Sequence, residues 1–193
     1  MRAFFIKKGL CMQIYFSSDL HLGHRGIIDF QNRPFQSVEE MNRTLIHNFN
    51  SVIHANDVLY LLGDVTHRIP ESEANGLIKK LKGRKILIRG NHDGDYDPIL
   101  FEGIYDYKEF NHEKMKYVLM HYPLMEWNRS RHNSSIHLHG HIHSDGQYNE
   151  ENRVNGILRY DVGVDANHYY PVSLQYIQQY FAESIRIRER GGV

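Results

Sequence analysis

Short apolar runs alternate with amphipathic stretches along the first half of the chain. Residues 13–18 and 58–62 are largely apolar, as expected for strands buried in a sheet, and residues 84–89 predict a third strand. Between them lie residues 37–53, whose apolar positions recur every three or four residues, and residues 71–82, which we also expect to be helical. This order of strand, helix, strand, helix and strand predicts a parallel sheet.

The second half of the chain predicts a second sheet and a closing helix. Residues 105–110 and 116–120 flank a polar turn, which indicates a hairpin, and residues 136–139 and 159–165 predict two further strands. Ser173 is expected to cap a final helix with apolar residues three or four positions apart. We therefore predict one α/β domain with two sheets.

Local signals also mark a helix start and two loops. Ser37 followed by Glu40 is a capping box at the start of the first helix. Gly23 and Gly26 predict a loop after the first strand, and residues 126–135 predict a second loop that is mostly polar.

The composition is that of an ordinary globular protein. The 193 residues suit a single domain, 41% are hydrophobic and 24% charged, and the formal net charge is zero. A neutral chain lacks the general excess of lysine and arginine that binds nucleic acid. A nucleic-acid partner is therefore not favoured, although a local basic patch would allow one.

The N-terminal residues do not resemble a signal peptide. They contain four apolar residues followed by two lysines, and no run in the chain approaches the roughly 20 apolar residues of a membrane span. Cys11 is the only cysteine and cannot form an internal disulfide. We therefore expect a cytoplasmic protein without a membrane partner. Met12 directly precedes the first strand, so residues 1–11 are predicted to be an N-terminal extension and residues 12–193 a single domain.

Five polar segments follow the predicted strands, and each contains groups that bind metals. The carboxyl ends of strands are where ligands bind in open α/β sheets, so these segments are expected to meet at one edge. Their imidazole, carboxylate and amide groups suit divalent metals. The segments are Asp19-Leu20-His21, Gly63-Asp64, Gly90-Asn91-His92-Asp93, His121 and Gly140-His141-Ile142-His143.

The residue types in these segments fit a two-metal hydrolase. Two metals about 3.5–4 Å apart can hold both the attacking and the leaving oxygen of a phosphoryl displacement, and a carboxylate can bridge them. Asp19, Asp64 and Asp93 are the carboxylates available. Divalent ions lower the pKa of coordinated water toward about 7, and an imidazole that is not a ligand can then protonate the leaving group.

This ordered set of segments resembles the calcineurin-like metallophosphoesterase superfamily. The resemblance extends from Asp19 to His143, with a further match at residues 161–165. It is closest to small bacterial and phage phosphoesterases, which share the forms His21-Leu22-Gly23-His24 and Arg33-Pro34-Phe35. The implied fold is α/β, a four-layer sandwich of two mixed β-sheets flanked by helices.

The resemblance also implies which residues hold two divalent ions of manganese, iron, zinc or nickel. One ion would take Asp19, His21, Asp64 and His143, and the other would take Asp64, Asn91, His121 and His141. Asp64 would then bridge the ions, and His92 would be the catalytic histidine that assists the leaving group.

One position departs from the pattern of many relatives. They place an aspartate three residues after the bridging aspartate, where it supports the catalytic histidine, whereas this chain has His67. Either His92 is supported elsewhere, with Asp93 as a candidate, or its pKa is tuned differently.

Several other residues have two interpretations. His24 and Arg25 follow the first pair of ligands closely enough to contact a bound phosphate, but a solvated loop would explain them equally well. Arg129 and Arg131 would close over an anionic substrate or be ordinary exposed arginines. Trp127 would stack on a base or cover the core.

The same holds for four residues later in the chain. His137 and His139 lie on the same predicted strand face as His141, and we expect them to be buried histidines bonded to the backbone. Asp165 and His168 would lie at the mouth of the site or in a turn.

The resemblance implies hydrolysis of phosphoesters, and the small size, without room for a capping domain, favours phosphodiesters. The expected partner is a small phosphoester, which includes nucleotides. A nucleotide phosphatase or a nuclease is the alternative, although the neutral charge disfavours a nuclease. An alternative of another class is a protein-interaction scaffold, because the superfamily includes a retromer subunit that uses this fold for protein contacts. The filled ligand positions disfavour it.

Overall fold

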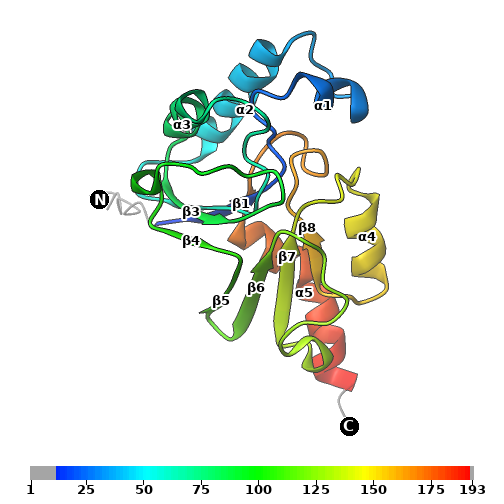
Figure 1. Cartoon of the computed structure of the whole chain (residues 1–193). Helices are drawn as coiled ribbons and strands as arrows, with labels where there is room; N and C mark the ends of the chain where they lie inside the picture. Colours follow the sequence, from blue (N-terminus) through cyan, green and yellow to red (C-terminus); the bar gives the residue numbers. More distant parts are fainter. Residues whose placement is uncertain (1–11, 192–193) are drawn as a thin grey trace, which may run out of the picture.

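The computed structural model describes residues 12–191, with side chains up to residue 185. The predicted extension at residues 1–11 lies outside the described residues. The first sheet has five strands in the order β4-β3-β2-β1-β9, of which β9 alone is antiparallel to its neighbour (Figure 1). Its strands are β1 (Ile14–Ser17), β2 (Val58–Leu61), β3 (Arg84–Ile88), β4 (Gly103–Tyr105) and β9 (Val172–Ser173).

The second sheet has four strands in the order β5-β6-β7-β8, with an antiparallel hairpin followed by two parallel pairings. Its strands are β5 (Tyr107–His112), β6 (Met115–Met120), β7 (Ser135–His139) and β8 (Arg159–Asp161). Only Asp106 separates β4 from β5, so the chain passes directly from one sheet to the other.

Five helices accompany the sheets within the described residues. They are α1 (Arg25–Phe30), α2 (Val38–Val52), α3 (Glu71–Lys79), α4 (Gln147–Val154) and α5 (Leu174–Gly191), and two short 3₁₀ helices cover Pro98–Leu100 and Ser130–His132. The predicted α/β fold with two mixed sheets is confirmed. In the part of the chain that is described, no helix is long and apolar enough to cross a membrane.

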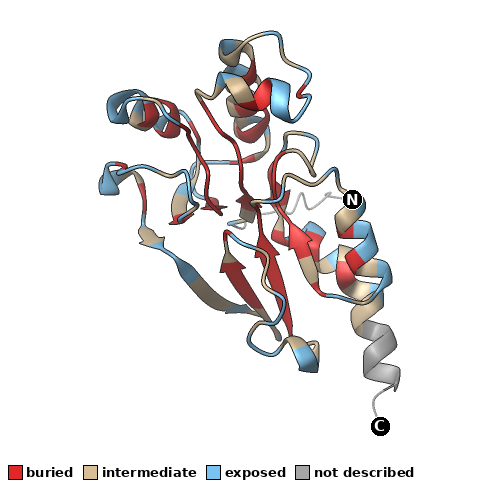
Figure 2. Cartoon of the chain, turned by 45° about the vertical axis from the view of Figure 1, so that its right-hand side comes forward, coloured by how far each residue is buried: buried red, intermediate tan, exposed pale blue. Residues whose placement is uncertain are grey.

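The first sheet is covered on both faces, which explains the continuous apolar run in β2. Leu59 and Leu61 pack in one hydrophobic cluster with residues of α2 and α3, whereas Val58 and Tyr60 belong to a second cluster between the two sheets. A strand buried on both faces has no need of polar residues at alternate positions. Each fully buried leucine contributes about 1.5–3 kcal/mol, so this burial holds the sheet in place. Figure 2 shows the buried residues concentrated in the central strands.

A row of stacked aromatic rings joins the sheets. The ring centroids of Phe16 and Tyr60 are 5.4 Å apart, those of Tyr60 and Phe110 are 5.3 Å apart, and those of Phe110 and Tyr117 are 5.1 Å apart. These residues come from β1, β2, β5 and β6. The row therefore fixes how the two sheets face each other.

The outer face of the second sheet is covered by α4 and by the loop of residues 121–134. Tyr148 of α4 packs edge-on against His139, with ring centroids 5.5 Å apart. From the loop, Trp127 packs on His137 at 5.3 Å. This layer of the sandwich is therefore partly loop.

Four elements differ from the sequence-based prediction because their local signals are weak. The segment after β1, predicted to be a loop, contains α1, whose one buried face is formed by Ile27 and Ile28. The short strands β4 and β9 exist only through pairing with β3 and β1. Helix α4 has no apolar periodicity, because its buried residues are Asn149 and Asn152. Asn149 hydrogen-bonds both the N and the O of Asp161, at 2.7 and 3.0 Å.

The predicted helix starts are confirmed by hydrogen bonds. Ser37 Oγ accepts from Glu40 N at 3.2 Å, and the Glu40 carboxylate accepts from Gln36 N at 2.8 Å. Ser173 Oγ accepts from Tyr176 N at 3.1 Å at the start of α5.

Candidate metal centre

The polar segments that follow the strands converge at one edge of the molecule. Asp19 follows β1 and Asp64 follows β2, and His21 N donates to Asp64 O at 3.0 Å. In the second sheet His121 follows β6 and Gly140 follows β7, and Gly140 N donates to His121 O at 2.9 Å. The carboxyl ends of these strands therefore meet, as the sequence predicted.

Two buried carboxylates lie at the centre of this edge. Asp64 Oδ2 is 3.6 Å from Nε2 of His21 and 3.6 Å from Nε2 of His121. Asp19 Oδ1 is 3.8 Å from Nε2 of His143. The donor atoms of Asp19, His21 and His143 lie within 4.8 Å of one another, and so do those of Asp19, Asp64 and His121. Asp64 is therefore situated between two groups of donors.

Asn91 and His141 complete the convergence. Asn91 Oδ1 is 3.1 Å from His121 Nε2, and the ring of His141 is 5.1 Å from that of His121. His141 N also donates to Asp19 Oδ2 at 2.9 Å, which ties the second sheet to the first. The structure thus brings together all seven residues that the resemblance implied as ligands.

The backbone at these residues adopts an unfavourable conformation. Asp19, His21, Asp64, His141 and His143 all have positive φ, between 47° and 73°. They are five of the twelve non-glycine residues with positive φ in the described chain. Such conformations are uncommon for residues with a Cβ and cluster at functional sites. The fold therefore maintains backbone strain to aim these side chains.

Two glycines of the motifs are required by close approach. A Cβ at Gly90 would lie 2.2 Å from Asp64 Oδ1, and a Cβ at Gly140 would lie 2.3 Å from Asp19 Oδ2. Any side chain at either position would displace a central carboxylate.

The donor groups fit divalent metal ions. Asp19 is fully buried, and among the described residues its Oδ1 and both ring nitrogens of His21 have no hydrogen-bond partner. Burial raises the pKa of Asp19 to about 7, although His143 opposes the shift. A buried carboxylate is costly without a countercharge. A divalent cation would supply that charge and would use the unpaired donors.

A buried ion pair orients one of the candidate ligands. Asp165 Oδ2 is 2.8 Å from His143 Nδ1, and both Asp165 oxygens accept from Arg33 at 2.8 Å. Arg33 also donates to the backbone oxygen of Asp19 at 2.8 Å. Burial opposes ionisation of Asp165, but the bonds from His143 and Arg33 outweigh it and keep its pKa below the ordinary value. Asp165 therefore belongs to the site. The sequence analysis did not assign Arg33 to the site. The only sign of its role in the sequence was the Arg33-Pro34-Phe35 motif.

Asp93 does not support His92 as we had considered. Its carboxylate accepts from the backbone N of Gly90 and Val65, both at 2.8 Å, from Asp64 N at 3.0 Å and from Tyr96 OH at 2.8 Å. It therefore holds together the turns that follow β2 and β3. No hydrogen bond between the Asp93 and His92 side chains is found in the described structure.

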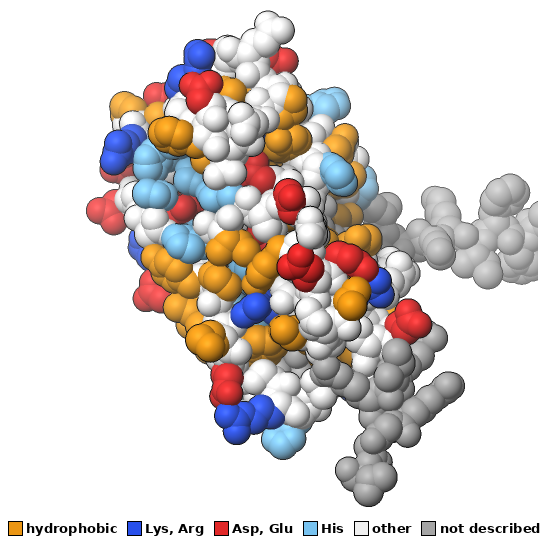
Figure 3. All heavy atoms as spheres, turned by 90° about the vertical axis from the view of Figure 1, so that its right-hand side faces the viewer, with side chains coloured by type: hydrophobic (Ala, Val, Ile, Leu, Met, Phe, Trp, Pro, Cys, Tyr) orange, Lys and Arg blue, Asp and Glu red, His pale blue; other side chains and the backbone are white. Residues whose placement is uncertain are grey.

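His92 lies at the exposed rim of the site. Its backbone N donates to Asp64 Oδ1 at 2.9 Å, which anchors it beside the central carboxylate. Its ring is 4.2 Å from that of His67 at an interplanar angle of 87°. In Figure 3, histidine side chains gather on one face of the molecule, next to a hydrophobic area.

Residues 12–179 match the sequence family of calcineurin-like phosphoesterases. The chain belongs to this family. It is 32% identical over 182 residues to the uncharacterised protein MJ1445 of Methanocaldococcus jannaschii, with 94% of each chain covered. It is 38% identical to the Gene 66 protein of Mycobacterium phage L5 over 84 residues, 42% of this chain and 40% of the phage protein. The crystal structure of AQ665 from Aquifex aeolicus, a protein of unknown function, is similar with a TM-score of 0.70 and 29% identity, covering 88% of this chain and 99% of AQ665.

Two more histidines lie near the donors of this calcineurin-like phosphoesterase. The rings of His24 and His67 are 4.1 Å apart, and the ring of His21 lies 5.5 and 5.7 Å from them. Burial, together with His24 and His92, lowers the pKa of His67 to about 4, and burial also lowers the pKa of His24. His67 is therefore neutral at pH 7, the state in which imidazole binds metals, and the shift at His24 favours the same state. His24 thus lies against the site.

Other candidates are directed elsewhere. Arg131 forms a salt bridge with Glu126 at 2.8 Å on the surface. His137 Nδ1 is 3.0 Å from Val118 O, and His139 Nδ1 is 2.8 Å from Gly140 O, as expected for buried histidines bonded to the backbone. Trp127, which packs on His137, covers the core.

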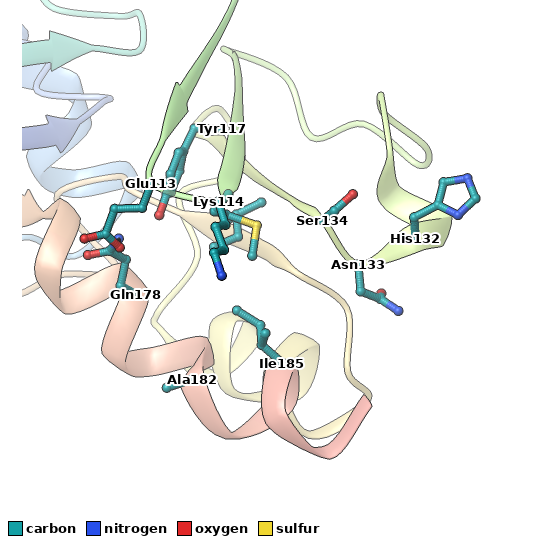
Figure 4. A pocket seen from close by; sticks show the side chains of 11 residues that line it. Glu113, Lys114, Tyr117, His132, Asn133, Ser134, Gln178, Ala182 and Ile185 are labelled. Carbon is teal, nitrogen blue, oxygen red and sulfur yellow. Dashed lines mark hydrogen bonds between the residues drawn. The ribbon is translucent and has the colours of Figure 1, made fainter. Parts of the chain in front are cut away.

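One hollow in this calcineurin-like phosphoesterase is separate from the candidate metal-binding groups. It measures about 520 Å³ and lies beside the turn between β5 and β6, the start of β7 and α5. Figure 4 shows Glu113 and Gln178 on one side of it and His132 at the far rim. No candidate ligand lines it, so we place the chemistry at the strand edge.

Proposed function

We propose that this chain hydrolyses phosphodiesters with two divalent metal ions. The observation that carries the proposal is the position of Asp64 Oδ2, which is 3.6 Å from His21 Nε2 and 3.6 Å from His121 Nε2. A carboxylate between two imidazoles from different strands is suited to bridging two ions. The family supplies the general class, a metal-dependent phosphoesterase.

The ligand sets of the proposal follow the motifs. Asp19, His21 and His143 would hold one ion together with Asp64, and Asn91, His121 and His141 would hold the other together with Asp64. The orphaned atoms at Asp19 and His21 support the first set, and the approach of Asn91 Oδ1 to His121 Nε2 supports the second. Imidazole ligands favour iron, zinc or nickel over magnesium, and the carboxylate ligands also suit manganese.

The chain's own residues have distinct tasks in this mechanism. The bound ions would supply Lewis acidity and make water nucleophilic at neutral pH. Asp165 holds the His143 ring through Nδ1, and Leu62 O is 2.8 Å from Nδ1 of His121, so these imidazoles present Nε2 to the centre. His92 is anchored through its backbone to Asp64, and its imidazole would donate a proton to the departing oxygen.

The openness of the site supports a diester substrate. Asn91 and His92 are exposed, and so is Ile142, which lies between His141 and His143. A phosphodiester carries groups on both sides of phosphorus and needs such access. A small nucleotide diester fits this description, and a nucleotide phosphatase remains the alternative.

A metal and substrate panel would test the proposal. Metal-stripped protein receives manganese, nickel, zinc, iron or magnesium and is assayed on bis(p-nitrophenyl) phosphate, a cyclic nucleotide, a nucleoside monophosphate and p-nitrophenyl phosphate. We expect diester hydrolysis with at least one transition metal. Faster monoester hydrolysis would favour the phosphatase, and tight metal binding without any hydrolysis would favour the scaffold.

Two substitutions would test the bridge. Asp64→Ala should lose more metal than Asp19→Ala, because only Asp64 would serve both ions. Asp29→Ala, an exposed carboxylate of α1, is the matched control and should keep the full metal content. Equal losses of a single ion in both central variants would mean that Asp64 is not the bridge.

A further inference from the structure

His24, His67 and His21 form a group of donors beside the proposed two-metal centre. One nitrogen of each lies within 4.8 Å of the others. The group comes from the turn after β1 and the turn after β2, and only His21 belongs to the proposed ligand sets. His24 and His67 are therefore potential ligands that the two-metal mechanism does not use.

The ring spacing is that of ligands around a common centre. The rings of His21 and His143, both proposed ligands of one ion, are 5.0 Å apart. His21 is 5.5 Å from His24 and 5.7 Å from His67, and the pair His24 and His67 is 4.1 Å apart at an interplanar angle of 39°. At 39° the two rings are tilted toward each other and are not stacked flat.

Hydrogen bonding supports the same conclusion. Nδ1 of His24, Nδ1 of His67 and both nitrogens of His21 are buried and have no hydrogen-bond partner within the described part of the chain. A histidine that binds a metal through one nitrogen normally donates from the other to an oxygen acceptor. His121 and His143 follow this rule through Nδ1. His21 does not, so one of its nitrogens remains unused after the other has bound its ion.

We propose that His24 and His67, with the remaining nitrogen of His21, bind a third transition-metal ion. Three imidazoles suit zinc or nickel, and three protein ligands leave a fourth position open to water or to a phosphate oxygen of the substrate. The involvement of His21 rests on the proposed function, which assigns its other nitrogen to the two-metal centre. Coordination through both nitrogens requires His21 to release its remaining ring proton to solvent.

The charges nearby predict the relative affinity of this third site. It contains no carboxylate of its own, and the positive charges of Arg33 and Arg68 act on His24. Asp64 is the carboxylate that acts on His67. The two-metal centre has two aspartates, whereas the third site has two neutral imidazoles and shares the charge of the deprotonated His21 ring with that centre. The third ion should therefore bind more weakly.

Metal titration of the full chain would test the proposal. Stripped protein is dialysed against increasing zinc and then analysed for metal content, and Co²⁺ is used in parallel because a four-coordinate site gives strong visible absorption. We expect two tight equivalents followed by a third, weaker one. His67→Gln and His24→Gln should each remove the third equivalent and its Co²⁺ absorption, and should keep the first two. His54→Gln, an exposed histidine after α2, should keep all three.

The outcomes separate this inference from the proposed function. A wild-type chain that saturates at two ions, with His67→Gln also binding two, overturns the third site and leaves the two-metal centre intact. A wild-type chain that binds fewer than two ions overturns the proposed function itself. Circular-dichroism melting shows that the variants are folded. If His67→Gln lowers the turnover number but keeps three ions, His67 acts on His92 through their ring contact, and the third site is wrong.

Discussion

The roles of individual histidines are decided by what bonds to their second nitrogen. His137 and His139 lie on β7, which leads directly into the segment that carries His141. Their rings stay in the core, where each is bonded to a backbone oxygen. His143 is bonded on one side to Asp165, which directs its other nitrogen toward Asp19. Identical side chains in one short stretch therefore lie either in the core or among the candidate metal ligands.

The first prediction at this scale concerns His92, the proposed proton donor. His92→Asn should keep the fold and the metals, because no proposed ligand is removed. General acid assistance contributes about 10²–10⁴-fold, so the turnover number on a diester with an alkoxide leaving group should fall by that order. With a nitrophenolate leaving group, which needs no proton, the loss should be much smaller.

The comparison between the two substrates contains its own control. A variant that has lost metal or structure would lose both activities alike, and metal analysis would detect it. Equal losses with the metals retained would assign His92 to substrate positioning, and loss of metal would make it a ligand.

The second prediction concerns Asp165. Asp165→Asn removes the charged acceptor that orients His143 and leaves Arg33 without its carboxylate. Replacing such a partner of a metal ligand typically weakens metal affinity about 10–100-fold. Competition with a chelator would measure this for one ion, with Asp29→Asn as the exposed control. Unchanged affinity in Asp165→Asn would show that the pair serves only the fold.

Secondary-structure elements with strong local sequence signals were predicted, and those with weak signals were not. Residues 37–53 were predicted as a helix and α2 covers Val38–Val52, because a capping box and an apolar stripe agree there. Helix α4 escaped prediction because asparagines occupy its buried positions. The hairpin was predicted with a turn at residues 111–114, but pairing of His112 with Met115 shortens the turn to Glu113 and Lys114.

The hairpin allows a prediction about pH. On β5, the Glu109 carboxylate accepts from Lys116 and from Tyr107 OH, and these bonds lower its pKa to about 2. In the unfolded chain its pKa is about 4.3. The ionised carboxylate therefore stabilises the fold above about pH 4.3, and this contribution is lost as the pH falls to about 2.

Thermal melting of the metal-free protein would measure the effect. Glu109→Gln should lower stability by about 0.2–1 kcal/mol at neutral pH, a shift of a few degrees at most. The difference should shrink as the pH falls from 5 to about 2. Glu73→Gln on the exposed face of α3 should show no such convergence. A difference independent of pH would mean that Glu109 acts by packing and not by charge.

At the scale of the whole molecule, the site exists because two sheets bring their carboxyl ends to one edge. The aromatic row from Phe16 to Tyr117 fixes the sheets face to face. His141 N then bonds Asp19 across the junction at 2.9 Å. Each of the two proposed ligand sets therefore contains residues that follow strands of both sheets.

The domain prediction is tested at this scale as well. A chain that starts at Met12 should retain its melting temperature and the proposed hydrolytic activity. It keeps the first contacts of the described chain, in which Met12 Sδ accepts from Arg84 at 3.6 Å and Gln13 N donates to Asp57 Oδ1 at 2.8 Å. The full chain, purified in parallel, is the control. A large loss of either property would show that residues 1–11 are part of the domain and not an extension.

The sequence by itself determined the order and chemistry of the candidate ligands. Each motif is local: a strand signal, a glycine and a donor residue lie within a few positions, and the strand places its own end at the sheet edge. The capping box and the apolar run of β2 are local signals of the same kind. These features could be predicted without knowing what packs where.

Only the tertiary structure decided which groups support those ligands. Arg33 and Asp165 are 132 positions apart, and Asp93 bonds backbone groups 28 and 29 positions away. The apposition of His24 and His67 also depends on how two turns pack. Local preferences act over a few residues, whereas these contacts form only after the chain closes long loops at an entropic cost that core burial must offset.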